Sequence, residues 1–97
     1  MKQKKFPTIL IIAGSDSGGG AGIQADIKAA SYFKVFATTA VTAVTAQNTL
    51  GVQSIFPIPE IEIQKQLRSV IGDLAPDLIK IGMLGTKEVV DCVAQEI

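Results

Sequence analysis

The sequence has no histidine, no tryptophan and a single cysteine, Cys92. One cysteine cannot form a disulfide within the chain. Without histidine or a second cysteine, the usual ligands of a zinc site are also missing. This use of cysteine favours a reducing compartment, and we expect the protein to be cytoplasmic.

Net charge and long apolar runs are absent as well. Nine Lys or Arg residues balance nine Asp or Glu residues, and the one basic cluster consists of Lys2, Lys4 and Lys5. Nucleic-acid binding needs a basic face rather than a short tail, so we expect no nucleic-acid partner. No run approaches the roughly 20 apolar residues that span a bilayer, and we expect no membrane segment. The apolar run 6–13 leads directly into glycines without the cleavage site of a signal peptide.

What is present is the composition of a folded domain. Hydrophobic residues make up 47% of the chain and charged residues 19%, a balance typical of globular proteins rather than disordered ones. A chain of 97 residues forms one domain at most and buries about two-thirds of its unfolded surface. The core is therefore expected to be thin.

Apolar periodicity predicts strands that alternate with helices. The predicted strands are 8–13, 36–46, 51–57 and 77–81, and the predicted helices begin near Ile23, at Pro59 and at Lys87. The expected apolar stripes are Ile23, Ile27 and Ala30 in the first helix, Ile63, Leu67, Val70 and Ile71 in the second, and Val89, Val90, Val93 and Ile97 in the third.

This alternation indicates an α/β fold with a parallel sheet and right-handed crossovers. A sheet of at most four strands leaves unpaired edges that invite another chain. The sequence also stops inside a predicted helix without a Gly or Pro stop signal, which favours a part of a longer protein.

The strongest local signal is the segment GSDSGGGAG at 14–22, with five glycines in nine residues between a strand and a helix. Glycines let the backbone approach a ligand with its N–H groups exposed, so a ligand loop is expected; a simple tight turn is the alternative. A Walker A loop would need Gly-Lys-Ser/Thr at its end, and the dinucleotide fingerprint starting at Gly18 fails at Ile23. We therefore do not expect ATP at this loop.

Two carboxylates, Asp16 and Asp26, flank this loop. Asp26 lies on the first turns of the predicted helix, where it could accept hydrogen bonds from a substrate amine or hydroxyl. It could equally complement the positive end of the helix dipole. Both interpretations remain open from the spacing.

Gln47, Asn48 and Thr49 follow a strand of small residues, at the strand end where ligands bind in open α/β sheets. A glutamine amide offers a donor and an acceptor, which suits an amino-substituted ring nitrogen. A turn at Asn48 and Thr49 is the alternative.

Met83 follows Gly82 at the end of another predicted strand, so its thioether could pack on a flat ring or fill the core. Cys92 lies on the apolar stripe of the last helix, where a structural role is expected.

Three segments, taken together and in this order, resemble the hydroxymethylpyrimidine and hydroxymethylpyrimidine-phosphate kinases of thiamine biosynthesis. They are IAGSDSGGGAGIQADIKAA at 12–30, TAVTAQNTLGVQS at 42–54 and IKIGMLG at 79–85. The resemblance covers nearly the whole chain after Pro7. It implies a ribokinase-like fold, a three-layer α/β/α arrangement with a mainly parallel sheet, of which residues 1–97 would be the N-terminal part of a single kinase domain.

The resemblance also implies the chemistry. The expected substrate is 4-amino-5-hydroxymethyl-2-methylpyrimidine, phosphorylated on its hydroxymethyl oxygen and then on the resulting phosphate, with ATP and Mg²⁺. Gln47 matches the pyrimidine-reading glutamine, and Asp26, Gly14, Thr45 and Met83 match positions lining the same pocket. The family often has Val where Thr45 stands, which implies a backbone or shape role for this residue.

Family members are more than twice as long, commonly form homodimers, and carry the anion hole, the catalytic residue and the adenine site in later segments. No catalytic residue is therefore expected within these 97 residues, and the chain alone is expected to be inactive. Two rivals remain: a pyridoxal kinase of the same superfamily, and a non-catalytic domain that binds a pyrimidine or a partner through its sheet edge.

Overall fold

The computed structural model describes residues 6–97, so Lys2, Lys4 and Lys5 lie outside the described residues. The chain forms the four strands and three helices that the periodicity predicts, with β3 following β2 directly. The elements are β1 (Thr8–Asp16), α1 (Gly22–Tyr32), β2 (Phe36–Asn48), β3 (Gly51–Pro57), α2 (Glu60–Leu74), β4 (Leu78–Ile81) and α3 (Lys87–Glu96).

The four strands form one mixed sheet in the order β3-β2-β1-β4. β1 lies parallel to both β2 and β4, which confirms a mainly parallel sheet. β3 is the exception, because it pairs antiparallel with the end of β2 after a tight turn. Two residues between β2 and β3 are too few for a parallel crossover, which needs about a dozen or more.

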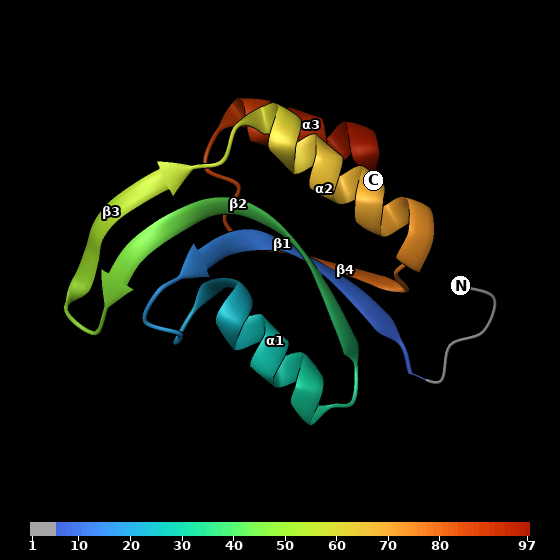
Figure 1. The fold of residues 1–97 in the computed structure, drawn as a ribbon, viewed down its shortest axis with the longest axis horizontal. Helices are drawn as coiled ribbons and strands as arrows, with labels where there is room; N and C mark the ends of the chain where they lie inside the picture. The colour runs from blue at the N-terminus through green and yellow to red at the C-terminus, as the bar shows by residue number, and fades with distance from the viewer. Residues whose placement is uncertain (1–5) are drawn as a thin grey trace.

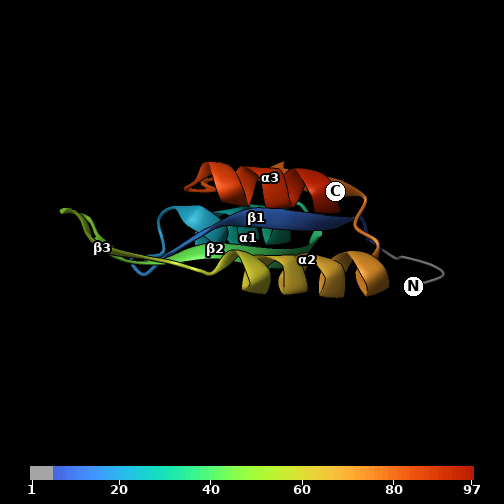
Figure 2. The same ribbon diagram turned by 90° about the horizontal axis from the view of Figure 1, so that it is seen from above.

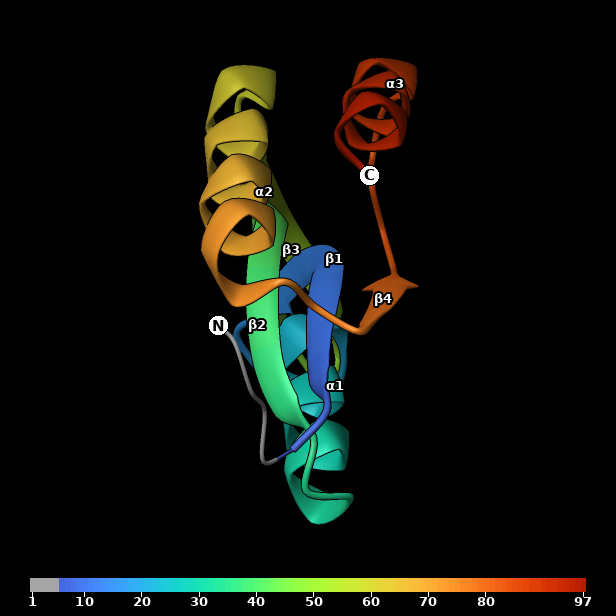
Figure 3. The same ribbon diagram turned by 90° about the vertical axis from the view of Figure 1, so that its right-hand side faces the viewer.

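The helices cover the sheet on both faces, which gives three layers. In Figures 1 and 3, α1 lies below the sheet, whereas α2 and α3 lie side by side above it. β3 and the end of β2 project beyond the helices in Figure 2. All residues of β3 and β4 are exposed, so these two strands are the open edges that the sequence predicts.

β1 and β2 are longer than predicted, and the difference matters for the site. The β1–β2 register shifts between Ala13 and Ser15, after which Ser15 and Asp16 still pair with Val44 and Thr45. This irregularity lets β1 continue past Gly14. β2 likewise continues through Gln47 to Asn48, so residues expected in loops lie on strand ends.

The main core lies between the sheet and the α2–α3 layer. It consists of Leu10, Ile12, Ala40, Ile63, Leu67, Val89 and Val93. Val90 and Ile97, expected on the stripe of α3, are exposed at 47% and 55%. Val90 is rotated by about 100° from its buried neighbour Val89 on a helix of 3.6 residues per turn, so both cannot face the core. Pro59, expected in the first turn of α2, instead occupies the N-cap.

A side chain from α2 replaces a missing strand at the edge of β2. The Gln66 amide accepts a hydrogen bond from Val41 N at 2.8 Å and donates to Val41 O at 3.0 Å. These are the two backbone groups that a neighbouring strand would satisfy. The amide therefore closes this edge where β3 no longer runs alongside.

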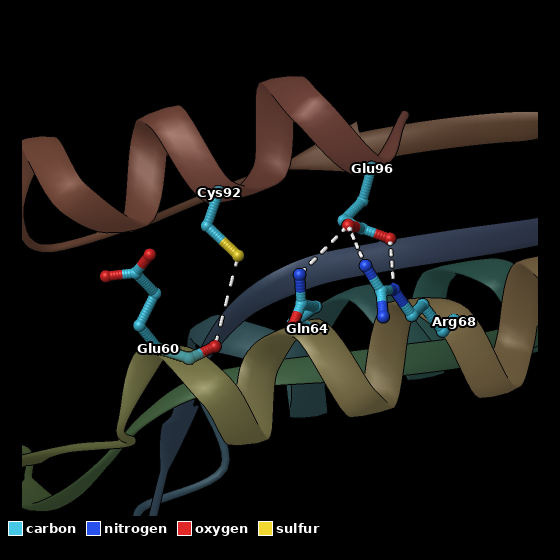
Figure 4. A network of polar contacts seen from close by, with 5 residues as sticks. All are labelled: Glu60, Gln64, Arg68, Cys92 and Glu96. Atoms are coloured by element: carbon cyan, nitrogen blue, oxygen red, sulfur yellow. Dashed lines mark hydrogen bonds and ion pairs between the residues drawn. The ribbon is translucent and has the colours of Figure 1, made fainter.

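Polar contacts also join α2 to α3 (Figure 4). Arg68 Nε lies 3.0 Å from Glu96 Oε1, and Gln64 Nε2 lies 3.2 Å from Glu96 Oε2. The hydrogen bond from Arg68 holds the pKa of Glu96 below its ordinary value, Gln64 adds to this, and desolvation opposes both. The pair therefore stabilises the helix layer when Glu96 is ionised.

Glu96→Gln is expected to make stability less sensitive to acid. A carboxylate with a depressed pKa in the folded state stabilises above its unfolded pKa, and this contribution disappears as pH falls through the folded pKa. The relevant window therefore lies below the ordinary Glu value of 4.5. Urea unfolding at neutral and acidic pH should show that the free energy of unfolding falls less on acidification in the variant than in the wild type. Equal losses would contradict the role, and Glu62→Gln, in an exposed pair with Lys65, is the control.

No helix among residues 6–97 is long and apolar enough to cross a membrane.

Candidate functional site

A cavity of about 230 Å³ lies where β1, β2 and β4 end and α1 begins. Four of the five residues predicted for the site line it: Gly14, Thr45, Gln47 and Met83. This is the carboxyl edge of the parallel strands, where ligands bind in open α/β sheets. Because drug-sized ligands occupy pockets of roughly 300 Å³ or more, this one suits a single-ring ligand.

Close backbone approach shapes the floor of this cavity. A Cβ at Gly14 would come within 3.0 Å of Met83 Cε, and one at Gly82 would come within 2.8 Å of Ala13 Cβ. A side chain at Gly82 would push β1 and the segment after β4 apart, whereas one at Gly14 would displace the end of the Met83 side chain. Met83 is 46% exposed, so its thioether borders the cavity and does not fill the core.

The glycine loop is closed by its own carboxylate. Asp16 is buried, and its two carboxylate oxygens accept hydrogen bonds from Gly18 N at 2.8 Å, Gly20 N at 3.0 Å and Ala21 N at 2.8 Å. Gly19 N donates to the carbonyl oxygen of Asp16. The expectation of free loop N–H groups is therefore wrong at these four positions. They are not available to cradle a phosphate.

Gln24, to which the sequence analysis gave no role, joins α1 to the end of β1 through two hydrogen bonds. Gln24 Oε1 accepts from Asp16 N at 2.8 Å, and Gln24 Nε2 donates to Ser15 Oγ at 2.7 Å. The carbonyl of Ser15 accepts in turn from Thr45 Oγ1 at 2.8 Å. The walls of the cavity are thus linked through hydrogen bonds between α1, β1 and β2.

Gln47 is held at both its backbone and its side chain. Ser17 Oγ lies 2.7 Å from Gln47 N and 2.7 Å from Gln47 O. Thr45 Oγ1 lies 3.2 Å from Gln47 Oε1. The sequence reasoning found Gln47 from its place after a strand of small residues but missed Ser17, whose partner is 30 positions away.

Asp26 is placed differently from the other four predicted residues. Its carboxylate forms an ion pair with Lys80 Nζ at 2.7 Å, and it borders a neighbouring apolar groove of about 250 Å³ beneath α1 and β4. Lys80 lines both the groove and the cavity. Asp26 therefore contacts the cavity only through Lys80, a residue that the sequence analysis did not single out. The feature that could have identified Lys80 is a lysine inside the short apolar strand LIKI.

Cys92 has the structural role expected of it. The side chain is buried between α2 and α3, 3.9 Å from the carbonyl oxygen of Glu60. Burial raises the pKa of this thiol, and the charges of Glu60 and Glu96 raise it further. The thiol is therefore protonated at neutral pH and unsuited to act as a nucleophile.

Within residues 6–97, no three His, Cys, Asp or Glu side chains come together as ligands for a metal ion. Four N–H groups of the glycine loop, at residues 18–21, are already bound by Asp16. The cavity at this edge therefore has the size of a single ring, beside a loop whose N–H groups at 18–21 are already hydrogen-bonded.

Similarity to known proteins extends over most of this chain. The family model described as phosphomethylpyrimidine kinase matches residues 16–97. The hydroxymethylpyrimidine/phosphomethylpyrimidine kinase of Haemophilus influenzae is 60% identical over 86 residues, which is 89% of this chain and 32% of that protein. The chain spans about a third of the length of such relatives.

Two solved structures have the same fold. The phosphomethylpyrimidine kinase of Clostridium difficile superposes with a TM-score of 0.88 at 41% identity, covering 95% of this chain and 39% of that one. The pyridoxal kinase of Staphylococcus aureus, in complex with AMP-PCP and pyridoxal, gives 0.86 at 34% identity, covering 96% and 35%. These likenesses confirm the ribokinase-like fold, and the match of the family model over residues 16–97 shows that the chain belongs to the phosphomethylpyrimidine kinase family.

Proposed function

We propose that the protein carrying this chain phosphorylates 4-amino-5-hydroxymethyl-2-methylpyrimidine and its monophosphate, with ATP as the phosphate donor and Mg²⁺ as the metal. The observation that carries the proposal is the meeting of Gln47, Thr45, Gly14 and Met83 around one ring-sized cavity. In this role Gln47 reads the polar edge of the pyrimidine, while Met83 packs against the ring and Gly14 leaves room for it.

Asp26 belongs to the proposed substrate side through its ion pair with Lys80. Lys80 lines the cavity, so replacing its partner Asp26 would change the position of the Lys80 ammonium group at the cavity wall. We propose that Asp26 orients the ammonium group at the cavity wall. It would contact substrate only if Lys80 moved aside.

We propose further that residues 1–97 are the N-terminal part of a single kinase domain. Other segments of that domain would bind ATP and Mg²⁺ and would contain the catalytic residue. The binding of the loop N–H groups of Gly18, Gly20 and Ala21 by Asp16 supports this division, because these groups are not free for a phosphate. Because phosphoryl transfer depends on positioning and charge stabilisation at the transferring group, this chain alone should not catalyse it. ATP-dependent phosphorylation by the purified 97-residue chain would contradict the proposal.

Gln47→Ala tests the substrate assignment. The lost hydrogen bonds should lower kcat/KM for the pyrimidine by about 10- to 100-fold, because a polar contact to a bound ring is removed. Turnover is measured with the natural gene product and with its Gln47→Ala variant. Gln53→Ala is the matched control, since Gln53 lies on β3 and bonds Gly51 O at 2.9 Å, outside the cavity lining. A normal kcat/KM in Gln47→Ala would remove this residue from the site.

Pyridoxal kinase is the second candidate, favoured by the structural likeness to the staphylococcal enzyme. The two rings differ in their polar edges, because the pyrimidine carries an amino group beside a ring nitrogen. Comparing kcat/KM for the pyrimidine and for pyridoxal in one preparation decides between them. We expect the pyrimidine to be preferred.

We also propose a cytoplasmic homodimer. The exposed apolar side chains of β3, Val52, Ile55 and Phe56, support an association surface, since an open strand edge pairs readily with another chain. The balanced charge of the chain supports partners other than nucleic acid. Light scattering during size-exclusion chromatography gives the number of subunits, and a monomer at all concentrations would contradict the dimer.

A further inference from the structure

The sheet by itself holds the backbone of Gln47 poorly. The β1–β2 ladder has its last rung at Asp16 and Thr45, so β1 ends before it reaches Gln47. On the other side, the β2–β3 register shifts between Ala46 and Gln47. Such a shift disrupts a ladder locally. The Gln47 backbone therefore depends on another partner to keep its place at the cavity.

Ser17 is this partner. Its hydroxyl donates to Gln47 O and accepts from Gln47 N, at 2.7 Å in each case. A hydroxyl has one proton and two lone pairs, so both hydrogen bonds form at once without competing. The Gln47 N–H and C=O are the groups that a further residue of β1 would otherwise satisfy. One side chain thus takes the place of the missing strand.

The glycine loop brings Ser17 within reach of β2. Asp16 Oδ1 accepts from Gly18 N at 2.8 Å, which turns the chain directly after β1. Gly18 then lies against β2, because a Cβ on it would come within 3.1 Å of Gln47 O and 3.3 Å of Asn48 Cα. A side chain at Gly18 would move the loop away from the strand and lengthen the hydrogen bonds of Ser17.

The position of the Gln47 backbone matters to a ligand because the Gln47 side chain lines the cavity. Hydrogen bonds weaken steeply outside donor–acceptor distances of about 2.7–3.2 Å. A small displacement of the backbone would therefore weaken a contact between the carboxamide and a bound ring. The glycine loop, whose own N–H groups are bound by Asp16, can act on the ligand through this one residue.

We propose that Ser17 is a positioning residue, which fixes the backbone of Gln47 and so sets the strength of the contact between Gln47 and the ring. The glycine loop serves to hold Ser17 at this place. This inference rests on the proposed pyrimidine-binding function. Ser17 lies outside the cavity lining, so its effect reaches the ligand through Gln47.

Three variants test this role. Ser17→Ala removes the hydroxyl and Ser17→Thr keeps it. Thr86→Ala is the matched control, since it removes a hydroxyl that caps α3 by accepting from Val89 N at 3.2 Å, outside the cavity lining. KM and kcat for the pyrimidine are measured with the natural gene product and with each variant. Ser17→Ala is also measured in the Gln47→Ala background, and thermal unfolding compares the stabilities.

Ser17→Ala should raise KM about fivefold, the scale of one neutral hydrogen bond, with kcat within about twofold. In the Gln47→Ala background the same substitution should change KM by less than about twofold, because the side chain through which Ser17 acts is gone. Ser17→Thr should keep KM near the wild-type value. Thr86→Ala should lower stability without raising KM.

Three outcomes would overturn the inference. An equal rise in KM in both backgrounds would show that Ser17 does not act through Gln47. A rise with Thr86→Ala as large as with Ser17→Ala would indicate a general loss of stability. Failure of Ser17→Thr to keep KM low would show that the hydroxyl is not the group responsible.

Hydrogen exchange separates this inference from the proposed function. The Gln47 N–H donates to Ser17, so it should exchange faster in Ser17→Ala than in the wild type, with no substrate present. Unchanged exchange would contradict the positioning role. If the wild-type protein does not phosphorylate the pyrimidine, the proposed function itself fails, whatever the exchange shows.

Discussion

Gly22→Ala is expected to destabilise the protein by about 3 kcal/mol, the combined scale of a left-handed non-glycine residue and an overpacked core site. Gly22 begins α1 at φ 60°, a backbone conformation that L side chains rarely adopt. A Cβ there would overlap the carbonyl oxygen of Gly14 and come within 3.2 Å of Asp16 N. Because both neighbours are backbone atoms, they cannot move away as a flexible side chain would.

The same substitution should also disturb the cavity, since Gly14 and Asp16 form part of its wall. Urea unfolding measures the loss of stability, and the affinity for the pyrimidine should fall with it. Gly72→Ala is the matched control. Gly72 lies inside α2 with no atom within 4 Å of its added Cβ, so alanine should stabilise by about 0.5–1 kcal/mol. Similar effects at the two glycines would contradict the steric argument.

Asp16→Asn is expected to cost about 2–3 kcal/mol, the scale of charged hydrogen bonds that are replaced by facing donors. The carboxylate accepts from three backbone N–H groups, at Gly18, Gly20 and Ala21. An asparagine amide has only one oxygen, so its NH₂ group would face at least one of these donors. The glycine loop should lose its closed conformation in consequence.

Chemical unfolding and hydrogen exchange of the loop amides measure this effect. Exchange at Gly18, Gly20 and Ala21 should become faster than in the wild type. Asp91→Asn is the control because its ion pair with Lys87 is exposed and 3.7 Å long, so its removal should change stability by less than about 0.5 kcal/mol. Unchanged exchange in Asp16→Asn would show that other contacts hold the loop.

The order of strands and helices could be predicted from local pattern. The apolar run of β1 and the stripe through Ile63 and Leu67 depend on spacing along the chain, and spacing is visible in a sequence. The same reasoning placed Gln47 and Met83 at strand ends, where parallel strands bring their carboxyl ends together. Strand ends were predicted less well, because an irregular register lets Ser15 and Asp16 pair after the shift.

The roles of individual polar groups could not be predicted in the same way. Asp16 and Asp26 looked alike as carboxylates flanking a glycine loop. In the fold, Asp16 binds the loop itself, whereas Asp26 pairs with Lys80, 54 residues further along the chain. Nothing local distinguishes these outcomes, because a hydrogen-bond partner is selected by position in space.

The sequence by itself determined an α/β chain with a glycine loop and a glutamine at neighbouring strand ends, since hydrophobic periodicity and turn chemistry act over a few residues. Only the tertiary structure decided that the loop amides are already satisfied by Asp16 and that Gln47 is held by Ser17 and Thr45. Ser17 and Gln47 are 30 residues apart along the chain. Hydrogen bonds act over about 3 Å, so their partners exist only once the strands are packed.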